Sequence, residues 1–179
     1  DNPWIRLRRY EAIAPTGAPA DYALVHFKKI AVGVLPVDAD GFVHLVGQSR
    51  FPFGAYSWEA PEGGCEANED PLDCARREMA EEAGVRADHI LKILEMDLSN
   101  SVTDEQSICY IGWDLHPASG ELDAVELFRR RRLHFLDAVQ EAADGRIRDS
   151  MTVAMLYRAH HMAVTGLLPE ALTQVMLRR

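Results

Sequence analysis

Short runs rich in apolar residues mark the first half of the chain. Residues 22–27 alternate between apolar and polar positions, and two later runs are mainly apolar, and both patterns are typical of β-strands. The runs are an extended start and three strand-like segments, at 4–10, 22–27, 30–37 and 42–48. The pair Asp40-Gly41 is a good signal for a tight turn, so we expect the last two runs to form a hairpin. Two further strands are expected at 90–98 and 107–115, separated by a polar loop.

Helical spacing of apolar residues appears in three later segments. The first helix is expected to begin at Asp70-Pro71, because the aspartate can accept a free backbone N–H and proline is tolerated at the first helical position. Gly84 can turn left-handed and end it. Two more helices are expected at 135–143 and 150–165. This order of elements predicts an α/β fold, an α/β/α sandwich around a mixed β-sheet, preceded by an N-terminal β-hairpin.

Three glutamates converge on one side of the first predicted helix. Glu78 and Glu82 are one turn apart, and Glu81 lies on the neighbouring row. Two like charges about 5 Å apart repel by ~3 kcal/mol at an effective dielectric constant of about 20, so a compensating cation is expected. Arg77 can neutralise part of this charge, and all-oxygen ligation suits Mg²⁺ or Mn²⁺ better than zinc. The alternative is a solvated acidic helix face.

Composition limits the classes of partner. The chain has 179 residues and a net charge of −9, which argues against nucleic acid as the main partner. An edge strand is expected at 125–133, and its four consecutive arginines, 129–132, could form either a basic edge or a nucleic-acid patch. No apolar run approaches the length of a membrane span, and the chain lacks a signal-like start. The three cysteines favour reduced thiols in a cytoplasmic protein.

The residues from Gly63 to Val85 follow the spacing G-x5-E-x7-R-E-(apolar)-x-E-E-x-G-(apolar) without a departure. This segment resembles the Nudix box, the motif of hydrolases that cleave nucleoside diphosphates linked to another group. The resemblance implies that Glu78 and Glu82 ligate Mg²⁺ or Mn²⁺, together with the backbone carbonyl of Glu62.

The resemblance implies roles for other residues of the box. Glu81 is expected to act in catalysis, as a further ligand or by holding water. Glu69 and Arg77 are expected to brace the loop and helix as partners of the ligands. Gly64 is expected to lie against the substrate.

Outside the box, the chain resembles the branch of the family that contains ADP-ribose and ADP-sugar pyrophosphatases. Gln48-Ser49-Arg50 matches the Q-x-R segment of that branch, and residues 58–63 and 145–154 are similar to two further segments. Arg50 is expected to bind substrate phosphate or stack on a base, unless it is simply paired at the surface. Glu105 is expected to be the general base, with a solvated loop carboxylate as the alternative. The branch often has alanine where Glu62 stands.

The base-binding aromatic residues are left open between a binding role and the core. The candidates are Trp4, Phe51, Phe53 and Tyr56.

The expected activity is Mg²⁺-dependent hydrolysis of ADP-ribose or a related nucleoside diphosphosugar to a nucleoside monophosphate and a sugar phosphate. The alternatives are another nucleotide substrate (a nucleoside triphosphate, a dinucleoside polyphosphate or GDP-mannose) and a non-catalytic nucleotide-binding regulator. Members of this branch are typically homodimers in which N-terminal strands reach the partner. Residues 1–28 are therefore expected to form a dimerising arm, and residues 29–179 the hydrolase domain.

Overall fold

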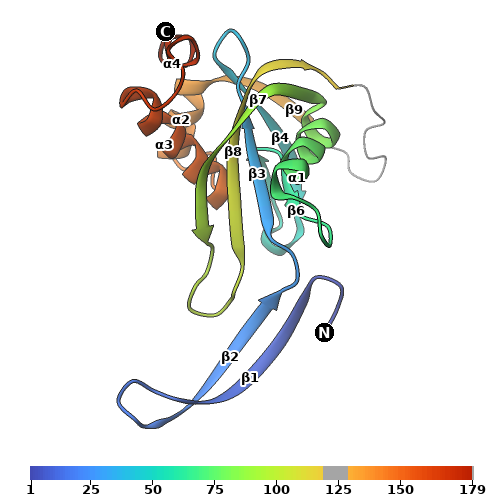
Figure 1. The fold of residues 1–179 in the computed structure, drawn as a ribbon, viewed down its shortest axis with the longest axis vertical. Helices are drawn as coiled ribbons and strands as arrows, with labels where there is room; N and C mark the ends of the chain where they lie inside the picture. Colours follow the sequence, from blue (N-terminus) through green and yellow to red (C-terminus); the bar gives the residue numbers. More distant parts are fainter. Residues whose placement is uncertain (119–128, 179) are drawn as a thin grey trace.

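A mixed four-stranded sheet forms the centre of the molecule (Figure 1). The structure is a computed structural model that describes residues 1–118 and 129–178. In the order β6-β3-β8-β7, the pair β3 and β8 is parallel and the other neighbouring pairs are antiparallel. These strands are β3 (Ala31–Pro36), β6 (Glu62–Gly64), β7 (Val85–Asp97) and β8 (Gln106–Pro117). The two strands predicted after the first helix are confirmed, and both are longer than predicted.

Helices cover both faces of this sheet. Helix α1 (Pro71–Glu78) contacts β3, β6 and β7, whereas α3 (Ser150–Val164) contacts β3, β7 and β8. Val32 and Val34 of β3 belong to the buried cluster that includes α1, and Leu35 belongs to the cluster that includes α3. Because successive side chains of a strand point to opposite faces, one strand contributes to two cores. The predicted α/β/α sandwich around a mixed sheet is confirmed.

A second, antiparallel sheet has the strand order β5-β4-β9. Its strands are β4 (Phe42–Arg50), β5 (Ala55–Glu59) and β9 (Arg129–His134), with a short 3-10 turn, η1 (Phe51–Phe53), between the first two. The strand expected at 125–133 is found in part as β9, and residues 125–128 lie outside the described residues.

The hairpin prediction from Asp40-Gly41 is confirmed for the turn and is wrong for the pairing of the two strands. The N–H of Asp38 donates to the carbonyl of Phe42 over 2.9 Å, and Gly41 has a φ of +81°. Between the described strands β3 and β4, however, the pairing is limited to one bridge next to the turn, Val37 with Val43. The strands diverge because β3 takes β6 and β8 as neighbours while β4 takes β5 and β9.

Three helices follow β9 within the described residues. The two predicted helices are confirmed as α2 (Phe135–Ala143) and α3, and Asp149 caps α3 by accepting the N–H of Thr152 over 2.7 Å. Helix α4 (Glu170–Leu177) was not predicted, and it packs against α2 and α3. None of the described helices combines the length and the apolar character needed to cross a membrane.

The N-terminal hairpin extends away from the rest of the molecule (Figure 1). It consists of β1 (Ile5–Ile13) and β2 (Pro19–Phe27), paired antiparallel. The loop between β7 and β8 holds the base of this arm: the N–H of Val25 donates to the carbonyl of Val102 over 2.9 Å, and that of Phe27 donates to Asp104 over 2.8 Å. The predicted hairpin arm is confirmed as a fold element.

Candidate active site

The box helix begins and ends where its sequence predicts. Asp70 accepts the N–H of Leu72 over 2.8 Å, Pro71 occupies the first helical position, and Gly84 has a φ of +70°. Ala75 and Met79 are buried on the side that faces β3. The apolar side of the helix therefore packs on the sheet as expected, and this fixes where the glutamates emerge.

The last turn of the box helix is a π turn, η2 (Met79–Ala83), which the sequence did not predict. The N–H of Gly84 donates to the carbonyl of Met79, the wider spacing of a π turn. Arg130 of β9 donates from Nε to the carbonyl of Glu82 over 2.8 Å. A Cβ on Gly84 would overlap the Arg130 guanidinium. The contact between β9 of the second sheet and the end of this helix therefore requires glycine at this position.

Glu78 and Glu82 converge on the backbone of β6. Both residues are buried, and Oε2 of Glu82 accepts the N–H of Glu62 over 2.9 Å. The carboxylate of Glu78 lies directly against Gly63, where a Cβ would overlap Oε1 of Glu78. Two predicted ligands therefore lie beside the backbone of Glu62, whose carbonyl is the third.

Arg77 joins the glutamates of the box. It donates to both oxygens of Glu69 over 2.9 and 3.0 Å, to Glu78 over 2.7 Å and to Glu81 over 3.1 Å. Its hydrogen bonds and the N–H of Glu66 lower the pKa of Glu69 to about 2. Among the three glutamates that Arg77 contacts, the side chain of Glu81 is the most exposed. Arg77 therefore links the loop before α1 to the glutamates of the helix.

Arg50 lies next to Glu62 but is held by a different carboxylate. Its Nε lies 2.9 and 3.0 Å from the two oxygens of Glu59, and Nη2 bonds to Glu59 and, over 3.2 Å, to Glu62. Glu59 is only 2% exposed, so it is a buried counter-charge that sequence reasoning missed. Arg50 is thus paired with a buried carboxylate and not only at the surface, and the pairing fixes its guanidinium beside Glu62.

The donor set fits a divalent cation. Burial raises the pKa of Glu78, and Arg77 opposes that rise. Burial also raises the pKa of Glu62 well above its usual range, and Asp149 and Glu59 add to the effect. Oε2 of Glu62 is buried and has no hydrogen-bond partner among the residues that the structure describes. Buried carboxylates grouped in this way are stabilised by a positive charge in addition to the arginines, and hard oxygen donors suit Mg²⁺ or Mn²⁺.

Glu105 is not brought together with the box carboxylates. It lies in the loop between β7 and β8 and lines a cavity of about 460 Å³ at the base of the arm, with Lys28, Lys29 and Asp104 among its neighbours. Burial raises the pKa of Glu105. Among the described residues, no hydrogen bond or ion pair links its side chain to Glu78 or Glu82, and its role as a base stays a prediction.

Gly64 is the last residue of β6, pairs with Ala31 and lies under the side chain of Lys29. The four aromatic candidates for base binding are all exposed rather than part of the core. Their exposed fractions are Trp4 66%, Phe51 97%, Phe53 82% and Tyr56 47%.

Two arginines of the run on β9 pair with acidic side chains elsewhere in the fold. Arg131 bonds to both oxygens of Glu141 over 2.7 and 2.6 Å, and Arg132 bonds to Asp38 over 2.5 Å and Asp40 over 2.6 Å. Within the described sheet, β9 is an edge strand that pairs with β4. The predicted edge strand with basic side chains is confirmed within the described residues.

Comparison with known proteins assigns the family. A family model described as the NUDIX domain matches residues 27–150. The chain belongs to the Nudix family. Within this family it is 31% identical to the GDP-mannose pyrophosphatase of Yersinia enterocolitica (serotype O:8 / biotype 1B) over 131 residues, which are 67% of each chain.

Two further proteins match this Nudix chain over different lengths. It is 32% identical to the GDP-mannose pyrophosphatase of Yersinia pestis (strain Pestoides F) over 108 residues, 58% of this chain and 54% of that protein. The chain thus spans about half the length of this relative. A crystal structure described as an ADP compounds hydrolase is similar, with a TM-score of 0.82 and 18% identity over 94% of this chain and 91% of that one. This likeness shows a shared fold.

Proposed function

We propose that this Nudix protein hydrolyses the pyrophosphate bond of ADP-ribose or a related nucleoside diphosphosugar in the presence of Mg²⁺ or Mn²⁺. The products are a nucleoside monophosphate and a sugar phosphate. The observation that carries the proposal is the convergence of Glu78 and Glu82 on the backbone of Glu62 and Gly63. A box that had lost catalysis would have no reason to keep these carboxylates buried together at a cost in desolvation.

The cation, when bound, would screen the negative charge of the two phosphates and so favour attack by water. Glu78, Glu82 and the carbonyl of Glu62 would hold it. Arg77 keeps Glu78 oriented by a hydrogen bond of 2.7 Å, and Glu69 in turn holds Arg77. These bonds fix the carboxylates before substrate arrives, which lowers the cost of organising the site.

The remaining residues would act on the substrate. Arg50 would bind phosphate, and Gly64 would let the substrate approach the backbone of β6. Water adds to one phosphorus while the bond from that phosphorus to the bridging oxygen breaks, and a carboxylate takes the proton from the water. Glu105 is proposed as that base, and Glu81 as the residue that helps to hold the water.

GDP-mannose is the second candidate substrate. The observation that favours it is the 31% identity with a protein named GDP-mannose pyrophosphatase over two thirds of both chains. ADP-ribose and GDP-mannose share the diphosphate linked to a sugar, so the same carboxylates serve both and the base-binding residues decide between them.

A substrate panel with Mg²⁺ tests this proposal. It should contain ADP-ribose, GDP-mannose, a nucleoside triphosphate and a dinucleoside polyphosphate, with products separated by chromatography. We expect a nucleoside monophosphate and a sugar phosphate from at least one diphosphosugar. Preference for the triphosphate by orders of magnitude would contradict the proposal, as would tight nucleotide binding without any hydrolysis, which is the behaviour of a regulator.

We propose further that the chain is a cytoplasmic homodimer joined through the arm, residues 1–28. Cys65, Cys74 and Cys109 are free thiols, which is usual in a reducing compartment. An isolated two-stranded hairpin is marginally stable in water, yet the arm exposes Leu7 and Ile13 on one face. A second copy that covers this face would account for both features.

A further inference from the structure

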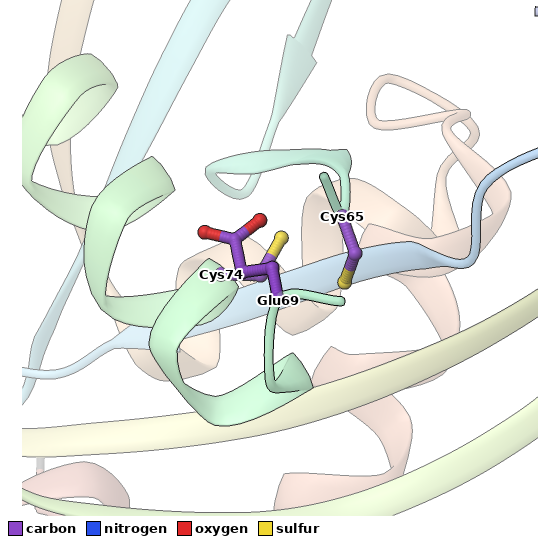
Figure 2. Close-up of side chains that lie close together, drawn as sticks. All are labelled: Cys65, Glu69 and Cys74. Carbon is purple, nitrogen blue, oxygen red and sulfur yellow. The ribbon is translucent and has the colours of Figure 1, made fainter. Parts of the chain in front are cut away.

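Two cysteines and a glutamate of the box lie close together beside the start of α1 (Figure 2). Cys65 follows β6, Cys74 belongs to α1, and Glu69 lies in the loop between them. One ligand atom from each, the two sulfurs and a carboxylate oxygen, all lie within 4.8 Å of one another. Cys74 is 0% exposed and Cys65 7% exposed, so both thiols lie in the interior.

Hydrogen bonds within the loop from Cys65 to Asp70 hold this geometry. The N–H of Glu69 donates to the carbonyl of Glu66 over 3.0 Å, and the N–H of Glu66 donates back to Oε2 of Glu69 over 2.8 Å. Asn68 has a φ of +68°, which reverses the chain. These bonds place the Glu69 carboxylate near Cys74, and the donor atoms are therefore preorganised.

We propose that Cys65, Cys74 and Glu69 form a binding site for a thiophilic divalent cation such as Zn²⁺ or Cd²⁺. Zinc binds thiolate sulfur at about 2.3 Å and carboxylate oxygen at about 2.0–2.2 Å, with a tetrahedral arrangement. The three protein donors would take three of these positions, and the fourth remains for water. Mg²⁺ prefers oxygen ligands, so this site differs in selectivity from the Glu78–Glu82 pair.

Arg77 offsets the negative charge that the proposed site would carry. Two thiolates, one carboxylate and a divalent cation leave a net charge of −1, which the guanidinium of Arg77 balances. Nη2 of Arg77 already lies 3.5 Å from Sγ of Cys74 and 3.0 Å from Oε2 of Glu69. An arginine that donates to the ligands is a typical outer partner of a metal site, and it would stabilise the thiolates once the ion has displaced their protons.

Cadmium titration of the reduced protein tests the site directly, since Cd²⁺-bound thiolates absorb in the ultraviolet. The titration is done with excess Mg²⁺, so that the oxygen sites are filled, and with a phosphine reductant. We expect one equivalent to bind with a thiolate absorption band and Zn²⁺ to displace it. Cys65→Ser and Cys74→Ser should each weaken binding at least tenfold, whereas Cys109→Ser, a buried cysteine on β8, should leave it unchanged.

Two results would overturn the proposal: no thiolate band in the wild-type protein, or an unchanged band in the Cys65→Ser, Cys74→Ser double variant. If these variants fail to fold by circular dichroism, X-ray absorption of the zinc-loaded wild-type protein replaces them. Two sulfur ligands per zinc support the site, and one or none contradicts it. Neither measurement depends on the proposed hydrolase activity.

Discussion

The backbone N–H of Glu62 donates a hydrogen bond of 2.9 Å to Oε2 of Glu82. Glu62 begins β6 and Glu82 lies in the π turn after α1, so this bond joins the central sheet to the end of the box helix. The pairing of Glu62 with Gly33 of β3 fixes the strand in turn. The carboxylate and the peptide backbone of the proposed cation site are therefore parts of one connected structure.

Gly63→Ala tests whether Glu78 must lie against β6. A methyl group at Gly63 would occupy the place of the Glu78 carboxylate, which can move because it ends a flexible side chain. We expect Mg²⁺-dependent turnover to fall by about a hundredfold, the order of loss that a displacement of about 1 Å can cause. The far-UV circular dichroism spectrum should stay unchanged. A turnover equal to wild type would show that Glu78 is not needed in this position.

Arg130→Ala tests the connection between β9 and the π turn. The carbonyl of Glu82 loses the hydrogen bond from Arg130, and we expect the free energy of unfolding in urea to fall by about 1 kcal/mol. Arg129→Ala is the matched control, because Arg129 is exposed and adjacent in the same strand. Its effect should be close to zero. Equal losses in the two variants would mean that net charge, and not this bond, determines the effect.

Glu69→Gln tests the brace through its pH dependence. Arg77 and the N–H of Glu66 lower the pKa of Glu69 from its usual value of 4.5 to about 2. The stabilisation from this lowered pKa is fully present above the usual value and is lost as the pH falls toward the folded-state value. Urea unfolding should therefore show a difference between wild type and Glu69→Gln that is constant well above pH 4.5 and shrinks as the pH falls from 4.5 toward about 2.

Glu66→Gln is the control for that series, since Glu66 is an exposed carboxylate of the same loop. A difference between wild type and Glu69→Gln that is independent of pH would argue against a charged Glu69 in the folded state.

Leu7→Asp tests the arm as a dimer contact. Leu7 is 70% exposed on the hairpin, and a charge there should prevent a second copy from covering it. Light scattering is expected to show a dimer for wild type and a monomer for the variant at the same concentration. Leu167→Asp, at a site 56% exposed near the end of α3, should remain a dimer. A monomeric wild-type protein would remove the arm from this role.

Local signals in the sequence predicted the parts of the fold that depend on neighbouring residues. The helix-start signal Asp70-Pro71 and the helix-stop residue Gly84 depend only on the few residues around them. A run of apolar residues likewise indicates a strand, whichever partner strand it later pairs with. Strand pairing is a long-range property, so the Asp-Gly turn predicted a hairpin although β3 and β4 enter different sheets. Helix α4 was missed because its stability comes from packing on α2 and α3.

The same distinction applies to the candidate site. The spacing of the box predicted that Glu69, Arg77, Glu78 and Glu82 would gather, because three of them share one helix. It could not show that Glu59 holds Arg50, nor that Arg130 reaches the carbonyl of Glu82, since these contacts depend on how the second sheet lies against the first. The approach of Cys65 to Cys74 depends likewise on the course of one loop.

The most direct test of the proposed activity is the Mg²⁺-dependent hydrolysis rate of Glu82→Gln with the best diphosphosugar of the panel. Glutamine keeps the shape of the side chain and can still accept the N–H of Glu62, so the variant should fold while it loses the negative charge that binds the cation. We predict a loss of at least about a hundredfold in turnover, with Glu66→Gln at wild-type level. Wild-type turnover in Glu82→Gln would contradict a cation held by the box carboxylates.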